Sequence, residues 1–575
     1  MNGTCRAAAA LRLPLASSPD AHAGACGRVI SALLLAAALA GCGADFRSVP
    51  DTPPSDDTAR QATLRQVYDA WIEIPDLALP GRALPATLAV DLEVTFSEDP
   101  LLDAGVAGAT QPAGSGAAGS PQVSAASGGA GAGTARVNLI AEYLDGTALP
   151  PPATRLWEIG FAREDNHLRF DPLAPFEVQG IFDSLVLEAD VDATGRRLSG
   201  AGVLVVLGRA GALRGVRQRN YLVAATDYAF GGSLARLRAR YDSRFTLFDG
   251  VEDAWTDPLV RVESGSAFLL NRFELVFSED DDNRHVEWLS PADGYRTIFS
   301  FSAGDGANPQ DLVIDARGRM WISRYEPPYD DLLIVDPHTG TRLGRLDLGA
   351  WTTGDGLVPR PEQMIRAGDA IYVTLQNSNL SFSAFGPARL LEIDTTTDSV
   401  AAAIELEGIN PFQGLEREPE SGLLYLSMAG VFPGQQAEQL SGGVEVVDPA
   451  TRASRGILVD DDDLGGHVND VAIASAAKAY VLISRRSGED FLTEVVAFDP
   501  RDGTILGTVY SGGAGGRNQV ADIEADGEGW LLLALRDPYD SGVRIIDTST
   551  DRPLPGGFFR THLFAVSLAT VRPGS

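Results

Sequence analysis

Residues suited to acid–base or metal chemistry are few and widely spaced in this chain. Six histidines occur among 575 residues. No two of them have the short spacing that zinc and copper sites use, so no metal and no cofactor are expected. His467 stands beside Asn469 and Asp470, where an imidazole could act as a general acid or base. An ordinary structural role is the alternative interpretation of His467.

Two acidic runs contain the oxygen ligands that calcium prefers, at residues 279–282 and 460–463. Neither run has the alternating loop with a central glycine and a distal glutamate. Solvated loops are therefore the favoured interpretation. No nucleophile elbow, phosphate-binding loop or dinucleotide fingerprint appears in a strand–turn–helix context. These residues alone predict no catalytic site.

The net charge bears on the class of partner, and the cysteine count bears on disulfides and metal sites. The formal net charge is -32, whereas nucleic-acid binding needs a clustered positive surface, so no nucleic-acid partner is expected. The acidity favours solubility. The three cysteines are Cys5, Cys26 and Cys42. A mature chain that begins at Cys42 has a single thiol, which excludes an internal disulfide and a thiolate metal site.

The N-terminus has the pattern of an export signal. An apolar run at residues 29–40 follows Arg28 and is too short to span a bilayer as a helix. It ends in Leu39-Ala40-Gly41-Cys42, which resembles the bacterial lipobox. That resemblance implies cleavage before Cys42 and attachment of a diacylglyceryl group to its thiol. Gly43 follows, so the resemblance to Gram-negative sorting implies a lipid-anchored place in the outer membrane. A plain secretory signal with a chance cysteine is the alternative.

Most of the chain's regularity lies in its second half, where an aromatic residue followed by an apolar run recurs every 50 to 55 positions. Each run follows a turn that is usually rich in glycine, serine or aspartate. The aromatic residues are Phe268, Trp321, Tyr372, Tyr425, Tyr480 and Trp530. A second marker, a strand that ends in an aspartate turn, follows within each unit. Its positions are Ser290, Asp336, Asp394, Asp448, Asp499 and Asp547. These side chains are expected to accept hydrogen bonds from the turn backbone.

Two interleaved markers at one period predict a repeated four-stranded unit, and radial repetition of such units is a β-propeller. We therefore predict an all-β fold with a six-bladed propeller at residues 262–571, with seven blades as the alternative count. The first unit is expected to begin at its second strand, near Ala267. The apolar strand at residues 563–568 would complete that blade and remove its open edge.

These repeats resemble the YVTN-type β-propeller repeats of bacterial surface and periplasmic proteins. Residues 372–377, Tyr-Val-Thr-Leu-Gln-Asn, are close to the motif that names them, and Asn308-Pro309 and Asn410-Pro411 resemble the strand-entry segments. The resemblance covers about the last 300 residues and implies a fold more than a function.

In an up-and-down propeller, the loop between the second and third strands of a blade lies on the same face as the link to the next blade. That face has long segments at 349–362, 377–388, 429–442 and 485–493. Long loops on a rigid scaffold are where binding concentrates. The inner strands open there, and their polar residues are the candidate ligand site. A structural role, in which these side chains bond backbone groups and tie blades together, is the alternative. The set comprises Asn308, Gln310, Asp311, Glu362, Gln363, Asn410, Gln413, His467, Asn469, Asp470, Arg517, Asn518, Gln519 and Asp522.

The N-terminal half divides into four predicted segments. Residues 1–41 are the signal peptide, and the polar residues 42–60 form a tether. Residues 61–255 alternate over short apolar runs, which predicts a β-sandwich-like domain or a small barrel. Within it, residues 104–134 are almost entirely Gly, Ala, Ser and Pro, and are expected to form a flexible surface insertion.

Three functions are compatible with these features. The first is a lipid-anchored envelope protein, periplasmic or surface-facing, whose propeller is a binding or scaffold module for a protein or glycan. The second is a propeller enzyme of lyase or lactonase type, with His467, Asp470 and Glu362 as candidates at the channel mouth. The third is an assembly factor for outer-membrane proteins. The absence of a catalytic constellation in the sequence favours the first over the second, and nothing in the residues separates the third from the first.

Overall fold

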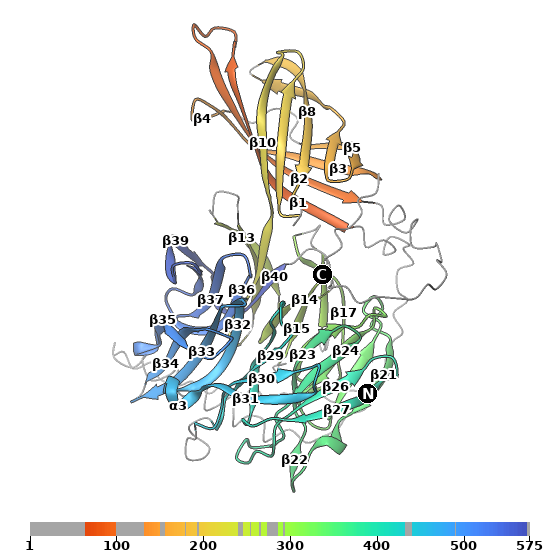
Figure 1. The fold of residues 1–575 in the computed structure, drawn as a ribbon, viewed down its shortest axis with the longest axis vertical. Coiled ribbons are helices and arrows are strands. Elements are labelled where there is room, and N and C mark those ends of the chain that lie inside the picture. Colours follow the sequence, from red (N-terminus) through yellow and green to blue (C-terminus); the bar gives the residue numbers. More distant parts are fainter. Residues whose placement is uncertain are drawn as a thin grey trace, which may run out of the picture. The chain divides into compact units, whose positions relative to one another are not determined.

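A computed structural model describes two regions of this chain, and both consist almost entirely of β-strands (Figure 1). The predicted signal peptide and tether and most of the predicted insertion lie outside the described residues. Among those residues, no helix is long and apolar enough to cross a membrane. The described ranges are 64–98, 131–149, 156–178, 180–192, 195–229, 231–239, 245–253, 255–263, 266–272, 286–290, 294–431, 440–488 and 490–571.

The first region is a single antiparallel sheet that closes on itself, which makes it a barrel, the second of the two architectures predicted for this half. Strand pairing follows the chain from one strand to the next, and pairing of β1 with β10 and of β2 with β3 completes the circle. Two short strands, β6 and β7, share one place in the circle because both pair with β8. The strands are β1 (Leu64–Leu77), β2 (Ala86–Glu98), β3 (Gly131–Leu144), β4 (Thr147–Ala148), β5 (Leu156–Glu164), β6 (His167–Phe170), β7 (Leu173–Val178), β8 (Ile181–Val191), β9 (Arg197–Leu204) and β10 (Arg209–Arg217).

Alternation along the strands fills the barrel interior with apolar side chains. In β1, Ala70, Ile72 and Ile74 are fully buried, whereas Trp71 is half-buried and Glu73 is exposed on the outer face. Strand β3 begins inside the segment predicted to be flexible. Its small residues pair with both β2 and β5, because a backbone ladder needs no large side chain.

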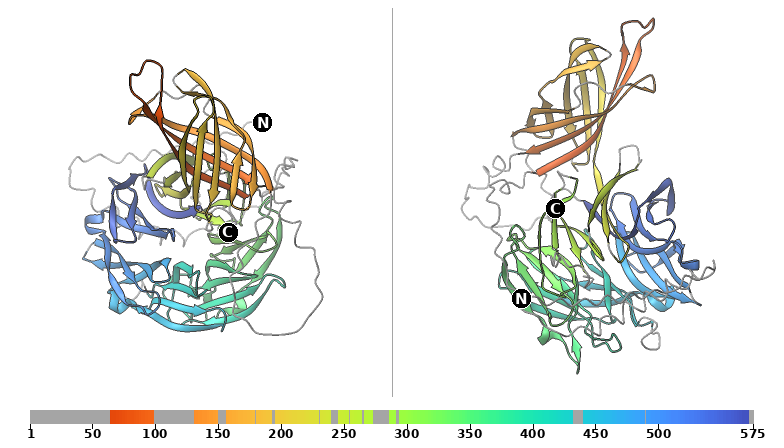
Figure 2. Two further views of the ribbon diagram at one scale, coloured as in Figure 1. Left: turned by 45° about the horizontal axis from the view of Figure 1, so that its top comes forward. Right: turned by 180° about the vertical axis from the view of Figure 1, so that it is seen from behind.

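The second region is a propeller of seven four-stranded antiparallel sheets (Figure 2). Blade 1 consists of β40 (Phe564–Val571), β11 (Arg219–Thr226), β12 (Gly232–Ala239) and β13 (Phe245–Asp253). Blade 2 is β14 (Pro258–Glu263), β15 (Ser266–Asn271), β16 (Val286–Ser290) and β17 (Arg296–Phe301). Blade 3 is β18 (Pro309–Ile314), β19 (Met320–Arg324), β20 (Asp331–Val335) and β21 (Arg342–Asp347). Blade 4 is β23 (Pro361–Ala367), β24 (Ala370–Leu375), β26 (Arg389–Asp394) and β27 (Ser399–Glu405).

The remaining blades follow the same order from the inner strand outward. Blade 5 is β28 (Pro411–Arg417), β29 (Leu424–Met428), β30 (Gly443–Asp448) and β31 (Ala453–Asp460). Blade 6 is β32 (His467–Ser475), β33 (Lys478–Ser487), β34 (Asp490–Phe498) and β35 (Ile505–Gly512). Blade 7 is β36 (Gln519–Ala525), β37 (Trp530–Arg536), β38 (Gly542–Asp547) and β39 (Arg552–Arg560). The links between blades contain η4 (Gly349–Trp351), β22 (Leu357–Val358), α3 (Asp461–Leu464) and η5 (Ala514–Gly516), and the loop between β24 and β26 of blade 4 contains β25 (Ser378–Asn379).

The propeller has seven blades, which is the alternative count, and not the six predicted from the repeat. The difference arises from the strands that make up blade 1. The C-terminal strand β40 does close the ring, as expected. It pairs with β11, however, and does not complete the blade that contains Ala267, because β14 already supplies that blade's inner strand. Residues 219–253, predicted to belong to the N-terminal domain, therefore form three strands of the propeller.

Both sequence markers occupy equivalent places in the blades. Each of the six aromatic markers lies on the second strand of its blade, from Phe268 on β15 to Trp530 on β37. The aspartates that end the third strands accept hydrogen bonds from turn amides, as predicted. Examples are His338 N to Asp336 Oδ1 at 2.8 Å and Ser549 N to Asp547 Oδ1 at 2.8 Å.

Candidate functional site

The inner strands of the propeller are joined by side chains and not by a backbone ladder. A carboxylate on one inner strand accepts a hydrogen bond from a backbone N–H of the next blade's inner strand. Such a bond joins blades 3 and 4, 4 and 5, 6 and 7, and 7 and 1. The pairs are Met364 N to Asp311 Oδ2 at 2.8 Å, Gln413 N to Glu362 Oε1 at 3.1 Å, Ile523 N to Asp470 Oδ2 at 3.3 Å and Leu568 N to Asp522 Oδ2 at 2.6 Å. Four members of the candidate site thus tie neighbouring blades together.

Arg261, on the inner strand β14, adds a half-buried cation to this set. Its Nε donates to Asp311 Oδ1 at 2.6 Å and its Nη2 donates to Gln363 Oε1 at 2.9 Å. Burial acts to lower the pKa of Arg261, but the charge and hydrogen bond of Asp311 outweigh it and leave that pKa raised. The sequence analysis did not select Arg261. Its position in a blade's inner strand was hidden because residues 258–263 had not been recognised as a strand.

Burial also changes the acidity of the inner-strand carboxyls. It raises the pKa of Glu362 to about 7, against the opposing hydrogen bonds from Gln413 N and from Gln376 Nε2, the latter at 3.0 Å. Asp470 and Asp522 lie close enough to interact, and burial followed by their mutual repulsion raises the pKa of Asp470 well above its usual value. At neutral pH these groups therefore hold protons more readily than surface carboxyls do.

The other predicted residues near the channel mouth also have partners within the propeller. Gln310 Nε2 donates to Asn308 Oδ1 at 2.6 Å, and Asn410 Nδ2 donates to Gly430 O at 3.0 Å. Ser484 Oγ donates to Asn469 Oδ1 at 2.8 Å. His467 is completely buried, with its Nδ1 2.8 Å from Ala429 O. Each of these predicted residues thus has a hydrogen-bond partner within the propeller's own strands and loops.

The loops between second and third strands, together with the links between blades, form one face of the propeller, called here the loop face. On it, Arg360 is 1% exposed and its guanidinium carbon lies 4.1 Å from the Phe382 ring centroid and 4.7 Å from that of Tyr325. Its Nη1 donates to Glu326 Oε1 at 2.9 Å. Tyr325 Oη donates in turn to Gln376 Oε1. This cluster connects the loops to Glu362 at the inner strands, and the sequence analysis missed it.

A second part of the loop face presents an aromatic ring to solvent. Tyr539 is 80% exposed and lies under the guanidinium of Arg517, 4.7 Å from carbon to ring centroid. Arg517 Nε donates to Asp537 Oδ2 at 2.7 Å, and Asn518 N donates to the same oxygen at 3.1 Å. Gln519 Nε2 donates to Phe491 O at 3.1 Å. Arg517 and Asn518 therefore bind Asp537 beside an exposed tyrosine that the sequence analysis did not select, whereas Gln519 is tied to the backbone of blade 6.

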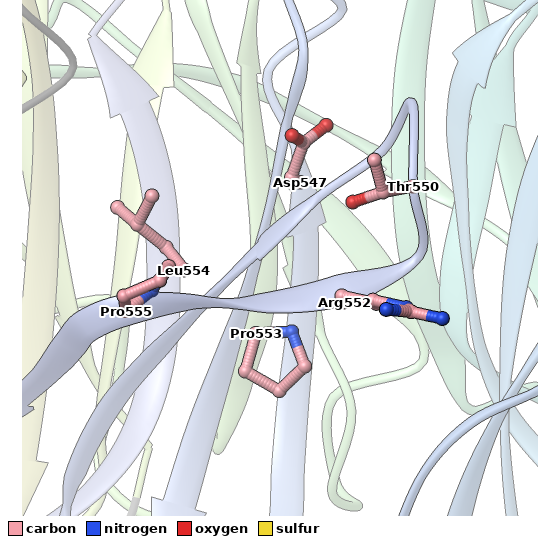
Figure 3. A pocket seen from close by; sticks show the side chains of 6 residues that line it. All are labelled: Asp547, Thr550, Arg552, Pro553, Leu554 and Pro555. Atoms are coloured by element: carbon pink, nitrogen blue, oxygen red, sulfur yellow. The ribbon is translucent and has the colours of Figure 1, made fainter.

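The opposite, short-turn face carries a shallow pocket at the β38–β39 turn of blade 7 (Figure 3). The lining residues are Asp547, Thr550, Arg552, Pro553, Leu554 and Pro555. Asp547 already accepts bonds from the amide and hydroxyl of Ser549. Its carboxylate therefore has a structural partner in the turn.

The remaining titratable candidates are separated from one another. His167 pairs with Asp190 in the barrel, with Nδ1 and Oδ1 2.8 Å apart. Asp460 begins the short helix α3 and accepts a hydrogen bond from Asp462 N at 2.9 Å, while Gly442 N donates to Asp461. In the described part of the chain, no group of three or more histidine, cysteine or carboxylate side chains is arranged to hold a metal ion. The acidic run at 279–282 lies outside the described residues.

Comparison with known proteins identifies similar folds but no family. No family model and no curated protein matches the chain. Among solved structures, the chain is similar to a provisionally assigned 6-phosphogluconolactonase from Bacteroides fragilis, with 11% identity and a TM-score of 0.42 over 62% of this chain and 98% of that one. It is similar to a virginiamycin B lyase from Staphylococcus aureus with 9% identity and a TM-score of 0.33, over 55% of this chain and 92% of that one. It is similar to the Dos1 propeller with 12% identity and a TM-score of 0.37, over 60% of this chain and 86% of that one. At these values no role carries over, and the propeller assignment depends on the chain's own seven sheets.

Proposed function

We propose that this protein is a lipid-anchored component of the bacterial envelope whose propeller binds a protein or glycan ligand through its loop face. One observation carries the proposal. Tyr539 is 80% exposed on that face, and Arg517 and Asp537 hold it in place. Tyrosine and arginine are the residue types enriched at binding hot spots, and an ordered exposed ring loses little entropy on binding.

A second exposed side chain extends this surface to another blade. Leu380, in the loop after β25 of blade 4, is 65% exposed. The neighbouring Phe382 packs on the buried Arg360, which fixes the loop's path. A rigid scaffold that presents exposed apolar and aromatic side chains from two blades fits a macromolecular ligand better than a small one.

The lyase or lactonase alternative would use Glu362, Asp470 and His467. The first two each accept a backbone N–H from the next blade, and the His467 ring lies against Ala429 O. Using them for catalysis would mean breaking bonds that join blades, so we favour binding. An outer-membrane assembly factor would be one particular case of a protein ligand on the loop face.

The anchor part of the proposal depends on Leu39-Ala40-Gly41-Cys42 and on the apolar run before it. Replacing the only thiol available for acylation, as in Cys42→Ser, is expected to move the protein from the membrane to the soluble fraction. Radiolabelled palmitate incorporation would be lost with it. A Cys26→Ser variant, altered within the predicted signal, is the matched control and should keep both properties. Membrane fractionation of Cys42→Ser identical to the parent would contradict the anchor.

The binding part is tested by photocrosslinking in intact cells. A benzophenone amino acid at position 539 should capture one discrete envelope partner, whereas the same group at Asp502, exposed in a turn on the opposite face, should not. Tyr539→Ala should reduce recovery of that partner in a pull-down several-fold. Two results would together overturn the assignment of the loop face. The first is crosslinking of the partner from both positions or from neither, and the second is unchanged recovery of the partner by Tyr539→Ala in the pull-down.

A further inference from the structure

The hairpin turns of the barrel fall into two groups, one at each end of its strands. The register places the β1–β2, β3–β4, β7–β8 and β9–β10 turns at one end (Figure 1). The β5–β6 and β8–β9 turns lie at the opposite end, where the chain enters the barrel at residue 64 and leaves it at residue 217. The two ends can therefore be compared turn by turn.

The two groups of turns expose different side chains to solvent. At the first end, called here the apolar end, large apolar side chains are exposed on or beside three turns. They are Leu84, Phe182, Val205 and Val206, which are 77%, 65%, 55% and 67% exposed. At the opposite end, the described side chains of the turns are polar. They are Asp165 and Asn166 in one turn, and Asp192 and Arg196 in the other.

The β9–β10 turn at the apolar end pairs three of its amides without water. Asp183, which is 4% exposed, accepts hydrogen bonds from Val206 N at 2.6 Å and from Leu207 N at 3.0 Å. Val205 N donates to Ser184 O at 3.0 Å. Backbone groups that enter the water-free part of a bilayer must be paired in this way, whereas water would serve them in a turn that stays in solvent.

The β1–β2 turn, which carries Leu84, is fixed to the turn beside it. Arg82 forms an ion pair with Asp145 of the β3–β4 turn, and Arg82 N donates to the carbonyl of the buried Leu79 at 3.2 Å. The exposed apolar side chains are thus presented by turns that are already ordered. Ordered groups lose less conformational entropy when they are buried against a second surface.

We propose that the apolar end inserts shallowly into the phospholipid bilayer that holds the lipid of Cys42, an inference that rests on the lipid anchor proposed above. Insertion removes the exposed apolar side chains from water, which is the favourable contribution. Even a single acyl chain binds a bilayer only marginally, so a few side chains add to the anchor and do not replace it. Cys42→Ser is therefore still expected in the soluble fraction, because lysis dilutes the membranes.

The chain between the anchor and the barrel is long enough for this contact. Residues 42–63 connect Cys42 to Leu64, which lies at the end of the barrel opposite the apolar end. An extended chain spans at most about 3.3–3.6 Å per residue, which gives this connection a reach of about 70 Å. Strand β1 has 14 residues and is about 45 Å long. The connection can therefore span the length of the barrel, and attachment raises the effective concentration of the bilayer at the apolar end.

The first test measures the environment of single positions without the anchor. A chain of residues 42–575 with Cys42→Ser keeps every described residue and has no cysteine, so Val206→Cys introduces a unique thiol. A nitrobenzoxadiazole fluorophore on it should brighten severalfold and emit at shorter wavelength when vesicles of phosphatidylethanolamine and phosphatidylglycerol are added. The same label at Asp165→Cys, at the opposite end, should not change. No change at position 206, or an equal change at both positions, would overturn the proposal.

Unlabelled variants of the same chain locate the contact. Val206→Asp should weaken cosedimentation with these vesicles at least tenfold, and calorimetry should show an unchanged barrel transition because Val206 is mostly exposed. The matched control is Leu343→Asp, which alters an exposed apolar residue on β21 of the propeller and should cosediment like the parent. Equal cosedimentation of Val206→Asp and the parent, or an equal loss in Leu343→Asp, would contradict insertion of the apolar end.

Two further outcomes distinguish this proposal from the anchor and from a protein interface. The vesicle assays use a chain without lipid, so a failure there leaves the anchor unaffected. If fractionation of Cys42→Ser contradicts the anchor while position 206 still enters vesicles, insertion stands without the contribution of the tether. A benzophenone amino acid at position 206 that captures one discrete protein in intact cells, together with no vesicle binding, would overturn insertion and make the apolar end a protein interface.

Discussion

The barrel and the propeller both close a β-structure into a ring, but they use different chemistry to do so. The barrel closes through backbone pairing, with β1 beside β10 and β2 beside β3, and its interior is filled by apolar side chains such as Ile72 and Ile74. The propeller closes through one strand, β40, contributed from the far end of the chain. Its inner strands are joined to each other mostly by side chains that accept backbone N–H groups.

The difference follows from geometry. Neighbouring strands of a barrel lie within one sheet, so each N–H meets a carbonyl of the next strand. The inner strands of adjacent blades belong to different sheets and form no such ladder with each other. Their buried N–H groups still need acceptors, because an unpaired buried N–H costs about 1–3 kcal/mol. Carboxylates such as Asp311 and Glu362 supply those acceptors. The barrel should therefore respond mainly to changes in volume, and the propeller to changes in charge and pH.

Removal of β40 should have the largest effect and should separate the two regions. A chain ending at residue 562 leaves β11 without its inner neighbour and leaves the acceptors Asp522 and Glu524 without the amides of Leu568 and Thr570. Because net domain stability is only about 5–15 kcal/mol, the propeller is expected to lose its cooperative fold. Limited proteolysis with mass spectrometry should show rapid cleavage at many sites in the propeller, which begins at residue 219, and a barrel fragment that survives longer.

A chain that lacks only residues 572–575 is the matched control for that truncation. These four residues follow β40 and should be removable without a change in the proteolysis pattern. If the chain ending at residue 562 resists protease as well as this control does, ring closure by β40 is not what holds the propeller together.

A rise in pH should have the next largest effect. Burial raises the pKa of Glu263 and of Glu362 to about 7, and it also raises those of Asp470 and Asp522. Since the folded propeller holds these protons more tightly than the unfolded chain does, the contribution of the two glutamates is complete below about pH 4.5 and is lost as pH rises through 7, and the contribution of the two aspartates is likewise lost as pH rises. Each glutamate contributes on the order of 3 kcal/mol to the free energy of unfolding at low pH, and this contribution is lost at high pH. Calorimetry between pH 5 and 8 should show the propeller's Tm falling.

Two substitutions sharpen the pH comparison between the regions. Glu362→Gln keeps an acceptor for Gln413 N but cannot ionise, so the fall in the propeller's Tm should become smaller. In the barrel, burial and then Glu177 raise the pKa of Glu142 to about 7, so Glu142→Gln should alter only the barrel transition. A propeller whose Tm rises between pH 5 and 8 would show that its inner carboxyls are ionised at little cost.

The sequence predicted the propeller because its signals are local. An aspartate that bonds its own turn, such as Asp499, and an aromatic residue at a fixed place on the second strand both act within one blade. The blade count needed non-local information, since blade 1 combines β11 with β40, which lie more than 300 residues apart in the chain. A marker was nevertheless present: Tyr221-Leu222-Val223 on β11 begins 47 residues before Phe268.

The candidate site shows the same limit. Residue type and blade position were enough to gather Asp311, Glu362 and Asp470 at the inner strands. They could not show which amide each carboxylate would accept, because that depends on how adjacent blades are staggered. Arg261 and Tyr539 were missed for different reasons: one lay in an unrecognised strand, and the other is a lone aromatic residue in a loop, with no repeat to mark it.

The smallest expected effect comes from the turns, where the two regions should behave alike. Asp499 in the β34–β35 turn accepts a hydrogen bond from Arg501 N at 2.9 Å, and Asp192 in the β8–β9 turn accepts one from Arg196 N at 2.8 Å. Both hydrogen bonds are exposed to solvent, so water replaces the lost partner in Asp499→Ala and in Asp192→Ala. Each variant should lower the Tm of its own region by about 2 °C or less, as measured by calorimetry. A much larger fall for Asp499→Ala alone would mean that the propeller depends on its turn aspartates as well as on its inner strands, and the contrast with the barrel would then extend to the surface.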